Sequence, residues 1–109
     1  MDVFVSGNRP PFESHLANLK EPARGMMLEL RAFAMSLGPQ VIEEVRPHRV
    51  VYAKTLTFRT FLDVEPAADH LIVETRAGRQ TPPVRMTVRT QEDLEQVKKA
   101  IAEAYEKVR

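Results

Sequence analysis

The middle of the chain alternates apolar and polar residues with the period of β-strands. Five segments rich in β-branched and aromatic residues follow one another between positions 41 and 89, separated by short polar or proline-containing breaks. The clearest segment places Val84, Met86 and Val88 on one side and polar residues on the other. Because successive side chains of a strand point to opposite faces of a sheet, this pattern predicts strands with one apolar face. Consecutive strands joined by short breaks are expected to pair as an antiparallel meander.

Proline residues mark two of the predicted strand ends. Pro47 follows the first strand and Pro66 ends the third, since proline lacks the N–H that a strand ladder needs. In the third strand, strict alternation places Leu62 on the apolar face, and it places Arg59 and Phe61 on the opposite face. We therefore expect five strands, at residues 41–46, 49–54, 56–65, 71–76 and 84–89.

Segments with the three- and four-residue spacing of helices lie on both sides of the strands. A short helix is expected from Phe12, a longer one begins at Pro22, and a third follows Thr90, whose hydroxyl is a good N-cap. Gly38 and Pro39 predict the end of the second helix, because glycine readily adopts φ > 0 and proline cannot continue a helix. The apolar stripe of that helix comprises Ala23, Met26, Met27, Leu30, Phe33, Ala34 and Leu37.

Together these elements predict an α+β fold. We expect a two-layer sandwich with N-terminal helices, a five-stranded antiparallel meander and a C-terminal helix, in which the helices pack on one sheet face. A chain of 109 residues is one domain of ordinary size. Residues 12–109 are expected to form this single domain, and residues 1–11, which contain Gly7, Asn8 and two prolines, a flexible tail.

The amino-acid composition limits the cellular compartment and the side-chain chemistry that we expect. The chain has no cysteine, which removes disulfides, thiolate metal sites and cysteine nucleophiles and fits a reducing cytoplasm. No secretory signal is recognised, and no window approaches the ~18 apolar residues of a membrane span, so we expect a cytoplasmic protein without a membrane partner. Lys and Arg number 16 and Asp and Glu 15, which argues against a general polyanion binder but allows a local patch.

No catalytic or metal-binding motif is found. His15, His48 and His70 fall in three different elements without the spacing of a zinc site, and the last two are interpreted most simply as solvated turn residues. Tyr52 and Lys54 share one strand face, where they could bind an anion or polarise a carbonyl group, although an ordinary amphipathic strand explains them more simply. We therefore expect no enzyme, no metal and no cofactor.

Several short patterns in the last seventy residues resemble those of one family. They are Leu37-Gly38-Pro39 before Val41, Tyr52-Ala53-Lys54 before a Phe58 strand, the strand Val84-Arg85-Met86-Thr87-Val88, and Asp93-Leu94 through Ala104-Tyr105. In these residues the chain resembles domain-of-unknown-function family 5655, a small domain also seen at the C-terminus of predicted transport proteins. The loop from Gly78 to Pro83 departs from the family, being shorter and without its Gly and Trp residues. The resemblance implies a helix–meander–helix fold and no catalytic residues.

The most unusual segment runs from Arg76 to Arg89. It carries four arginines and no acidic residue in a chain of net charge +1. If Met86 faces the helices, Arg85 and Arg89 project from the open face of the sheet, and the same alternation adds residues from neighbouring strands. Arginine and aromatic side chains interleaved on a sheet can bind phosphates and stack on bases. The candidate binding residues are Arg59, Phe61, Arg76, Arg79, Arg85 and Arg89.

Three interpretations of this face are open. In the first, a binding domain uses the arginines to hold nucleic acid or a phosphate-bearing ligand. In the second, the chain is a homodimer or an accessory protein-interaction module without small-molecule chemistry, and Phe61 and Ile72 lie in the interface. In the third and simplest, the face is solvated, and its arginines pair across strands with Asp63, Glu65 and Glu74.

Overall fold

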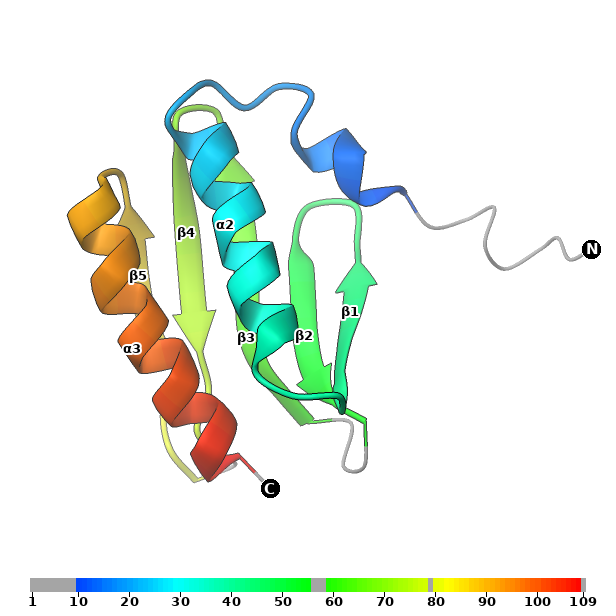
Figure 1. Cartoon of the computed structure of the whole chain (residues 1–109), viewed down its shortest axis with the longest axis vertical. Helices are drawn as coiled ribbons and strands as arrows, with labels where there is room; N and C mark the ends of the chain where they lie inside the picture. Colours follow the sequence, from blue (N-terminus) through cyan, green and yellow to red (C-terminus); the bar gives the residue numbers. More distant parts are fainter. Residues whose placement is uncertain (1–9, 56–58, 79, 109) are drawn as a thin grey trace, which may run out of the picture.

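The computed structural model of the chain describes residues 10–55, 59–78 and 80–108. Within them, five strands form one layer, and two helices lie side by side across one face of the sheet as the second layer (Figure 1). The predicted α+β architecture is confirmed. Most of the predicted tail, the first residues of the predicted third strand and Arg79 lie outside the described residues.

Each strand of the sheet pairs antiparallel with its neighbour in sequence, in the order β1-β2-β3-β4-β5. The predicted strand limits are confirmed to within one residue, except in β3, which continues through Pro66. The pairing of β3 with β2 stops at Val64, opposite Val50, so at Pro66 β3 has a neighbouring strand only on the β4 side. The missing N–H of Pro66 therefore costs no hydrogen bond of the sheet. In chain order the elements are η1 (Phe12–His15), α2 (Ala23–Ser36), β1 (Val41–Val45), β2 (Val50–Lys54), β3 (Arg59–Ala67), β4 (His70–Thr75), β5 (Val84–Val88) and α3 (Gln91–Lys107).

The first predicted helix is only the four-residue 3₁₀ helix η1, yet its apolar residues are buried as the spacing indicated. Phe12, Leu16 and Leu19 all belong to the core. Helix α2 buries the stripe expected for it and ends at Ser36. Among the described residues, no helix is long and apolar enough to cross a membrane.

Gly38 follows α2 for a reason that differs from the predicted one. No glycine in the described part of the chain has a positive φ. Instead, a Cβ atom on Gly38 would fall on the hydroxyl oxygen of Tyr105 in α3. The position requires glycine because another side chain approaches its backbone closely.

Helix α3 begins with a complete capping box. The Thr90 hydroxyl accepts a hydrogen bond from the Asp93 N–H at 3.1 Å, and the Asp93 carboxylate accepts one from the Thr90 N–H at 3.2 Å. At the other end of α3, Lys54 of β2 donates to the carbonyl oxygen of Val108 at 3.2 Å and lies over the ring of Tyr105. The helix therefore starts beside β5 and ends over the middle of the sheet (Figure 1).

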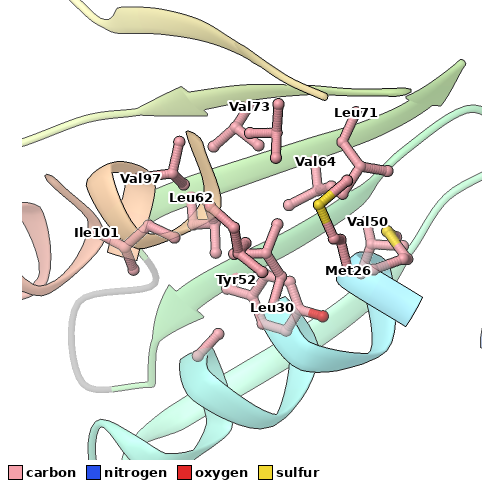
Figure 2. Close-up of a cluster of buried hydrophobic side chains, with 14 of the residues drawn as sticks. Met26, Leu30, Val50, Tyr52, Leu62, Val64, Leu71, Val73, Val97 and Ile101 are labelled. Atoms are coloured by element: carbon pink, nitrogen blue, oxygen red, sulfur yellow. The ribbon is translucent and has the colours of Figure 1, made fainter. Parts of the chain in front are cut away.

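The core lies between the helices and the inner face of the sheet. Val50, Val64 and Val73 stand side by side on β2, β3 and β4 and point toward the helices. Figure 2 shows how side chains from α2 and α3 meet this row, among them Met26, Leu30, Val97 and Ile101 with Tyr52, Leu62, Val64 and Leu71. Burying a side chain of this size contributes ~1.5–3 kcal/mol as an upper estimate. The packed side chains of the sheet and of the two helices therefore hold the two layers together.

A β-bulge in β3 changes which side chains face the helices. Tyr52 pairs with Leu62, but its neighbour Ala53 pairs with Thr60, so Phe61 is the extra residue. Phe61 is 0% exposed and makes an edge-to-face contact with Tyr105 at 5.2 Å between ring centroids. The prediction that Phe61 projects from the open face is therefore wrong, because the bulge turns both Phe61 and Leu62 inward.

The β3–β4 turn is tighter than the sequence indicated. Ala67 pairs with His70, and the Asp69 N–H donates to the Ala67 carbonyl oxygen at 2.6 Å. Ala68, at the centre of this turn, has φ of 55°. This is the left-handed region, which costs an L-residue other than glycine roughly 1–2 kcal/mol.

Candidate anion-binding site

The sheet face away from the helices carries an open hollow of about 750 Å³. Val51 and Asp63 pair across β2 and β3 within it, and they point outward because their neighbours Val50 and Leu62 belong to the core. Small-ligand sites commonly measure ~300–1,000 Å³. The hollow is therefore large enough for a small organic ligand.

Three guanidinium groups line this hollow, and they come from separate segments. Arg46 follows β1, Arg59 begins β3 and Arg76 follows β4. We call the space that they line the arginine hollow. Arg59 pairs with Lys54 in a row that faces the helices, so its side chain lines the arginine hollow from the end of the sheet, near Val108.

The carboxylate that lines the arginine hollow is already bound by a fourth arginine. Arg49 donates from Nη1 to Oδ2 of Asp63 at 3.1 Å, and its Nη2 lies 3.6 Å from Glu65. This hydrogen bond to Asp63 and the nearby negative charge raise the pKa of Arg49 above its usual range. The side chain of Asp63 is 13% exposed, so Arg49 holds it against the sheet as a neutralised wall of the site.

Two of the lining arginines also have carboxylate partners, both at the surface. Arg46 donates to Glu44 at 2.9 Å and Arg76 donates to Glu74 at 3.0 Å. The predicted pairing of arginines with acids on this face is thus present, although these two pairs join residues two apart on one chain segment rather than on adjacent strands. The Arg46 and Arg76 side chains are each 49% exposed, and exposed pairs of this kind contribute ~0.2–1 kcal/mol.

Neutral groups complete the arginine hollow. Thr60 and Thr81 bring hydroxyl groups, and Pro82 and Pro83 bring apolar surface from the loop between β4 and β5. Val51 lies beneath them and is only 3% exposed. The site therefore offers positive charge, hydroxyl groups and a small apolar floor together.

The predicted binding residues fall into three groups. Arg59 and Arg76 line the arginine hollow, but Arg59 belongs to a row that faces the helices, so its predicted place on the open face is wrong. Arg85 and Arg89 are exposed and lie on or next to β5, away from the hollow, where Arg89 is 3.9 Å from Asp69. Phe61 lies in the core, and Arg79 is outside the described residues.

Sequence reasoning missed Arg46 and Val51 as members of the site. Arg46 follows the last apolar residue of β1, where a solvated turn is the simplest expectation. Only the pairing of β2 with β3 brings Val51 next to Asp63. One local signal of the bulge was present, since the consecutive large apolar pair Phe61 and Leu62 interrupts strict alternation.

Tyr52 and Lys54 do not form the anion site that was considered for them. The Tyr52 hydroxyl donates to Glu43 at 2.7 Å, and burial together with this carboxylate raises the pKa of Tyr52. Lys54 is turned toward Tyr105 and the end of α3. Both side chains face the helices and have structural partners there.

Two of the three histidines have structural partners. His15 is buried, and its Nε2 donates to the carbonyl oxygen of Arg46 at 2.7 Å, because a carbonyl can only accept. It lines a second hollow of about 240 Å³ with His48 and Glu65. His70 lies 2.8 Å from the Asp69 carboxylate. Over the residues that the structure describes, no three His, Asp or Glu side chains form a group that could hold a metal ion.

Comparisons with family models, with curated proteins and with solved structures give no match for this chain. The resemblance to domain-of-unknown-function family 5655 therefore stays a prediction.

Proposed function

We propose that the chain is a small binding domain for a phosphate-bearing ligand that sits in the arginine hollow. One observation carries this proposal: Arg46, Arg59 and Arg76 line a single hollow, and its carboxylate, Asp63, is already held by Arg49. Planar guanidinium groups match phosphate oxygens with two parallel hydrogen bonds. The arrangement suits an anion better than a cation.

The existing ion pairs leave capacity for a ligand. Each arginine has five N–H donors, and the bonds of Arg46 to Glu44 and of Arg76 to Glu74 each use one of them. Because the arginine of each pair is about half exposed, a doubly charged phosphate can add to the pair or displace the carboxylate at small cost. Binding is therefore expected to weaken as salt concentration rises.

The neutral lining favours an organic phosphate over the bare ion. Thr60 and Thr81 can donate hydroxyl hydrogen bonds, while the exposed Pro82 and Pro83 offer apolar surface to the rest of the ligand. A volume of about 750 Å³ exceeds what a single phosphate group fills.

A small ligand is favoured over nucleic acid. Binding of single strands usually combines positive charge with aromatic rings on which bases stack. Within the described part of the chain, no aromatic side chain lines the arginine hollow, and Phe61 is in the core. The alternative of a protein-interaction surface centred on Phe61 loses its principal contact for the same reason.

The experiment is a titration of the ¹⁵N-labelled chain with inorganic phosphate and with phenyl phosphate, followed by amide chemical shifts. We expect shifts at Thr60, Gly78 and Thr81, and tighter binding of phenyl phosphate than of inorganic phosphate. Arg46→Gln and Arg76→Gln should each weaken binding about tenfold, as loss of a charge-assisted hydrogen bond does. Arg24→Gln makes the same charge change on an exposed position of α2 and should have little effect.

Two outcomes would contradict the proposal. One is shifts spread over all surface arginines, with Arg24→Gln as harmful as Arg76→Gln. The other is tight, salt-dependent binding of a single-stranded oligonucleotide that requires Arg85 and Arg89 but not Arg46. That result would place the binding site on the outer part of the sheet face instead of in the arginine hollow.

A further inference from the structure

One end of β5 has an apolar residue without a cover. Val84 is 52% exposed, more than any other large apolar side chain in the described part of the chain. It nevertheless shares the inward-facing side of β5 with Met86, which is partly buried, and Val88, which is fully buried. The cause is the oblique path of α3, which starts beside the Val88 end of β5 and ends near β3, within reach of Lys54 (Figure 1).

β5 is also an edge strand. It pairs with β4 on one side and is the last strand of the sheet on the other. An edge strand presents unpaired backbone N–H and C=O groups that another strand can satisfy. The Val84 end thus combines an uncovered apolar side chain with an unpaired ladder.

We propose that β5 pairs antiparallel with β5 of a second copy of the chain, around a two-fold axis at Met86. This register places Val84 opposite the partner subunit's Val88, and Arg85 opposite the partner subunit's Thr87. Two five-stranded sheets become one continuous ten-stranded sheet.

The two ends of β5 are complementary in this register. The end at Val84 is bare and the end at Val88 is covered by the start of α3, so the two-fold axis brings each bare end beside a covered one. On the open face, Arg85 meets a threonine of the partner rather than its own copy, which avoids like charges in direct opposition. Pro83 precedes the strand and cannot donate, so the new ladder ends after five residues.

The other edge of the sheet is less suited to self-association. β1 carries adjacent carboxylates at Glu43 and Glu44, and an antiparallel pair centred on Glu43 would place the two copies of that residue opposite each other. Pairing of β5 with β1 of another copy would join opposite charges, but it would not close and would produce filaments. The closed β5 pair is therefore the assembly that the charges and the uncovered Val84 favour together.

A five-residue ladder gives a small interface, so the dimer is expected to be weak, with a dissociation constant of roughly 10 μM to 1 mM. Sedimentation velocity on the full chain from about 10 μM to 1 mM should show a monomer–dimer equilibrium. A monomer throughout this range overturns the proposal, as does growth beyond the dimer.

Substitutions at exposed positions test the register without endangering the fold. Val84→Glu should abolish the dimer, whereas Leu28→Glu changes an apolar residue of similar exposure on α2 and should leave it intact. Thr87→Glu places a carboxylate opposite the partner subunit's Arg85 and should tighten the dimer about two- to tenfold, and Thr87→Arg should weaken it about as much. If Leu28→Glu disrupts the dimer while Val84→Glu does not, the interface is on α2 and the proposal is wrong; equal effects of both Thr87 substitutions contradict the register.

Discussion

The hydroxyl of Tyr52 donates a 2.7 Å hydrogen bond to Glu43, and Arg31 holds the same carboxylate with two further bonds of 2.9 and 3.0 Å. Tyr52 is on β2, Glu43 on β1 and Arg31 on α2, so one partly buried network joins both layers. The Arg31 guanidinium also lies over the Phe12 ring, 4.0 Å from its centroid, which connects η1 to the network.

Removal of Glu43 should destabilise the fold much more than removal of its neighbour. Glu43→Leu leaves the buried Tyr52 hydroxyl without its acceptor and Arg31 without its counter-ion, so we expect the free energy of unfolding to fall by about 2–4 kcal/mol. Glu44→Leu removes the partner of an exposed arginine from the opposite face of β1 and should cost less than ~1 kcal/mol. Urea denaturation measures both, and equal losses would show that the network is not stabilising.

The close approach of Gly38 to Tyr105 predicts that stability lost by a substitution at Gly38 can be recovered by a substitution at Tyr105. Gly38→Ala places a methyl group on the Tyr105 hydroxyl and should cost about 1–3 kcal/mol of unfolding free energy. In a Tyr105→Phe background the hydroxyl is absent, so most of that loss should disappear in a double-mutant cycle. Gly25→Ala, within α2, meets only the flexible end of Glu21 and should instead stabilise by roughly 0.5–1 kcal/mol. Additive effects at Gly38 and Tyr105 would refute the close contact.

The β3–β4 turn predicts a stabilising substitution. Ala68 has φ of 55°, where glycine fits without the steric cost that alanine carries. After allowance for the greater freedom of glycine in the unfolded chain, Ala68→Gly should raise the free energy of unfolding by about 0.5–1 kcal/mol. Ala67→Gly changes the adjacent strand residue and should lower it, so thermal denaturation of the two variants should move in opposite directions.

The capping box of α3 predicts a specific acid sensitivity. Hydrogen bonds from the Arg89 N–H, and then from Thr90, lower the pKa of Asp93 below its usual value. A carboxyl whose pKa is lower in the folded state adds stability above its unfolded pKa of roughly 4, and that stability is lost as pH falls through the folded value. Asp93→Asn should therefore flatten the decline of unfolding free energy below about pH 4, whereas Glu92→Gln, outside the box, should not. The measurement is urea denaturation at a series of pH values from 7 to 2, and an unchanged acid decline in Asp93→Asn would contradict the role of the box.

The fold was largely predictable because several local signals agree. Val84, Met86 and Val88 alternate in β5 with the period of a strand, and Thr90 with Asp93 forms the cap expected at the start of α3. Short connections then leave the meander as the simplest pairing of the strands. Such agreement between propensity, turns and pattern is what makes a sequence specify one architecture.

The candidate site was predictable only in part. Arg59 and Arg76 were identified, but a single extra residue at Phe61 reversed the faces assigned to the beginning of β3. Arg46 could not be placed near Arg76, because they are thirty positions apart and line the same hollow only through the pairing of four strands, β1 to β4. Alternation gives the face of a residue, whereas the neighbours across strands depend on register.

The bulge in β3 has a consequence for how this domain can change over time. Thr60 faces outward and Phe61 inward only because of the bulge, since strict alternation from Leu62 would turn Phe61 outward and Thr60 inward. The ligand-facing surface and the hydrophobic interior of this strand therefore depend on one shared local feature, and a change that closed the bulge with all residues kept would alter both.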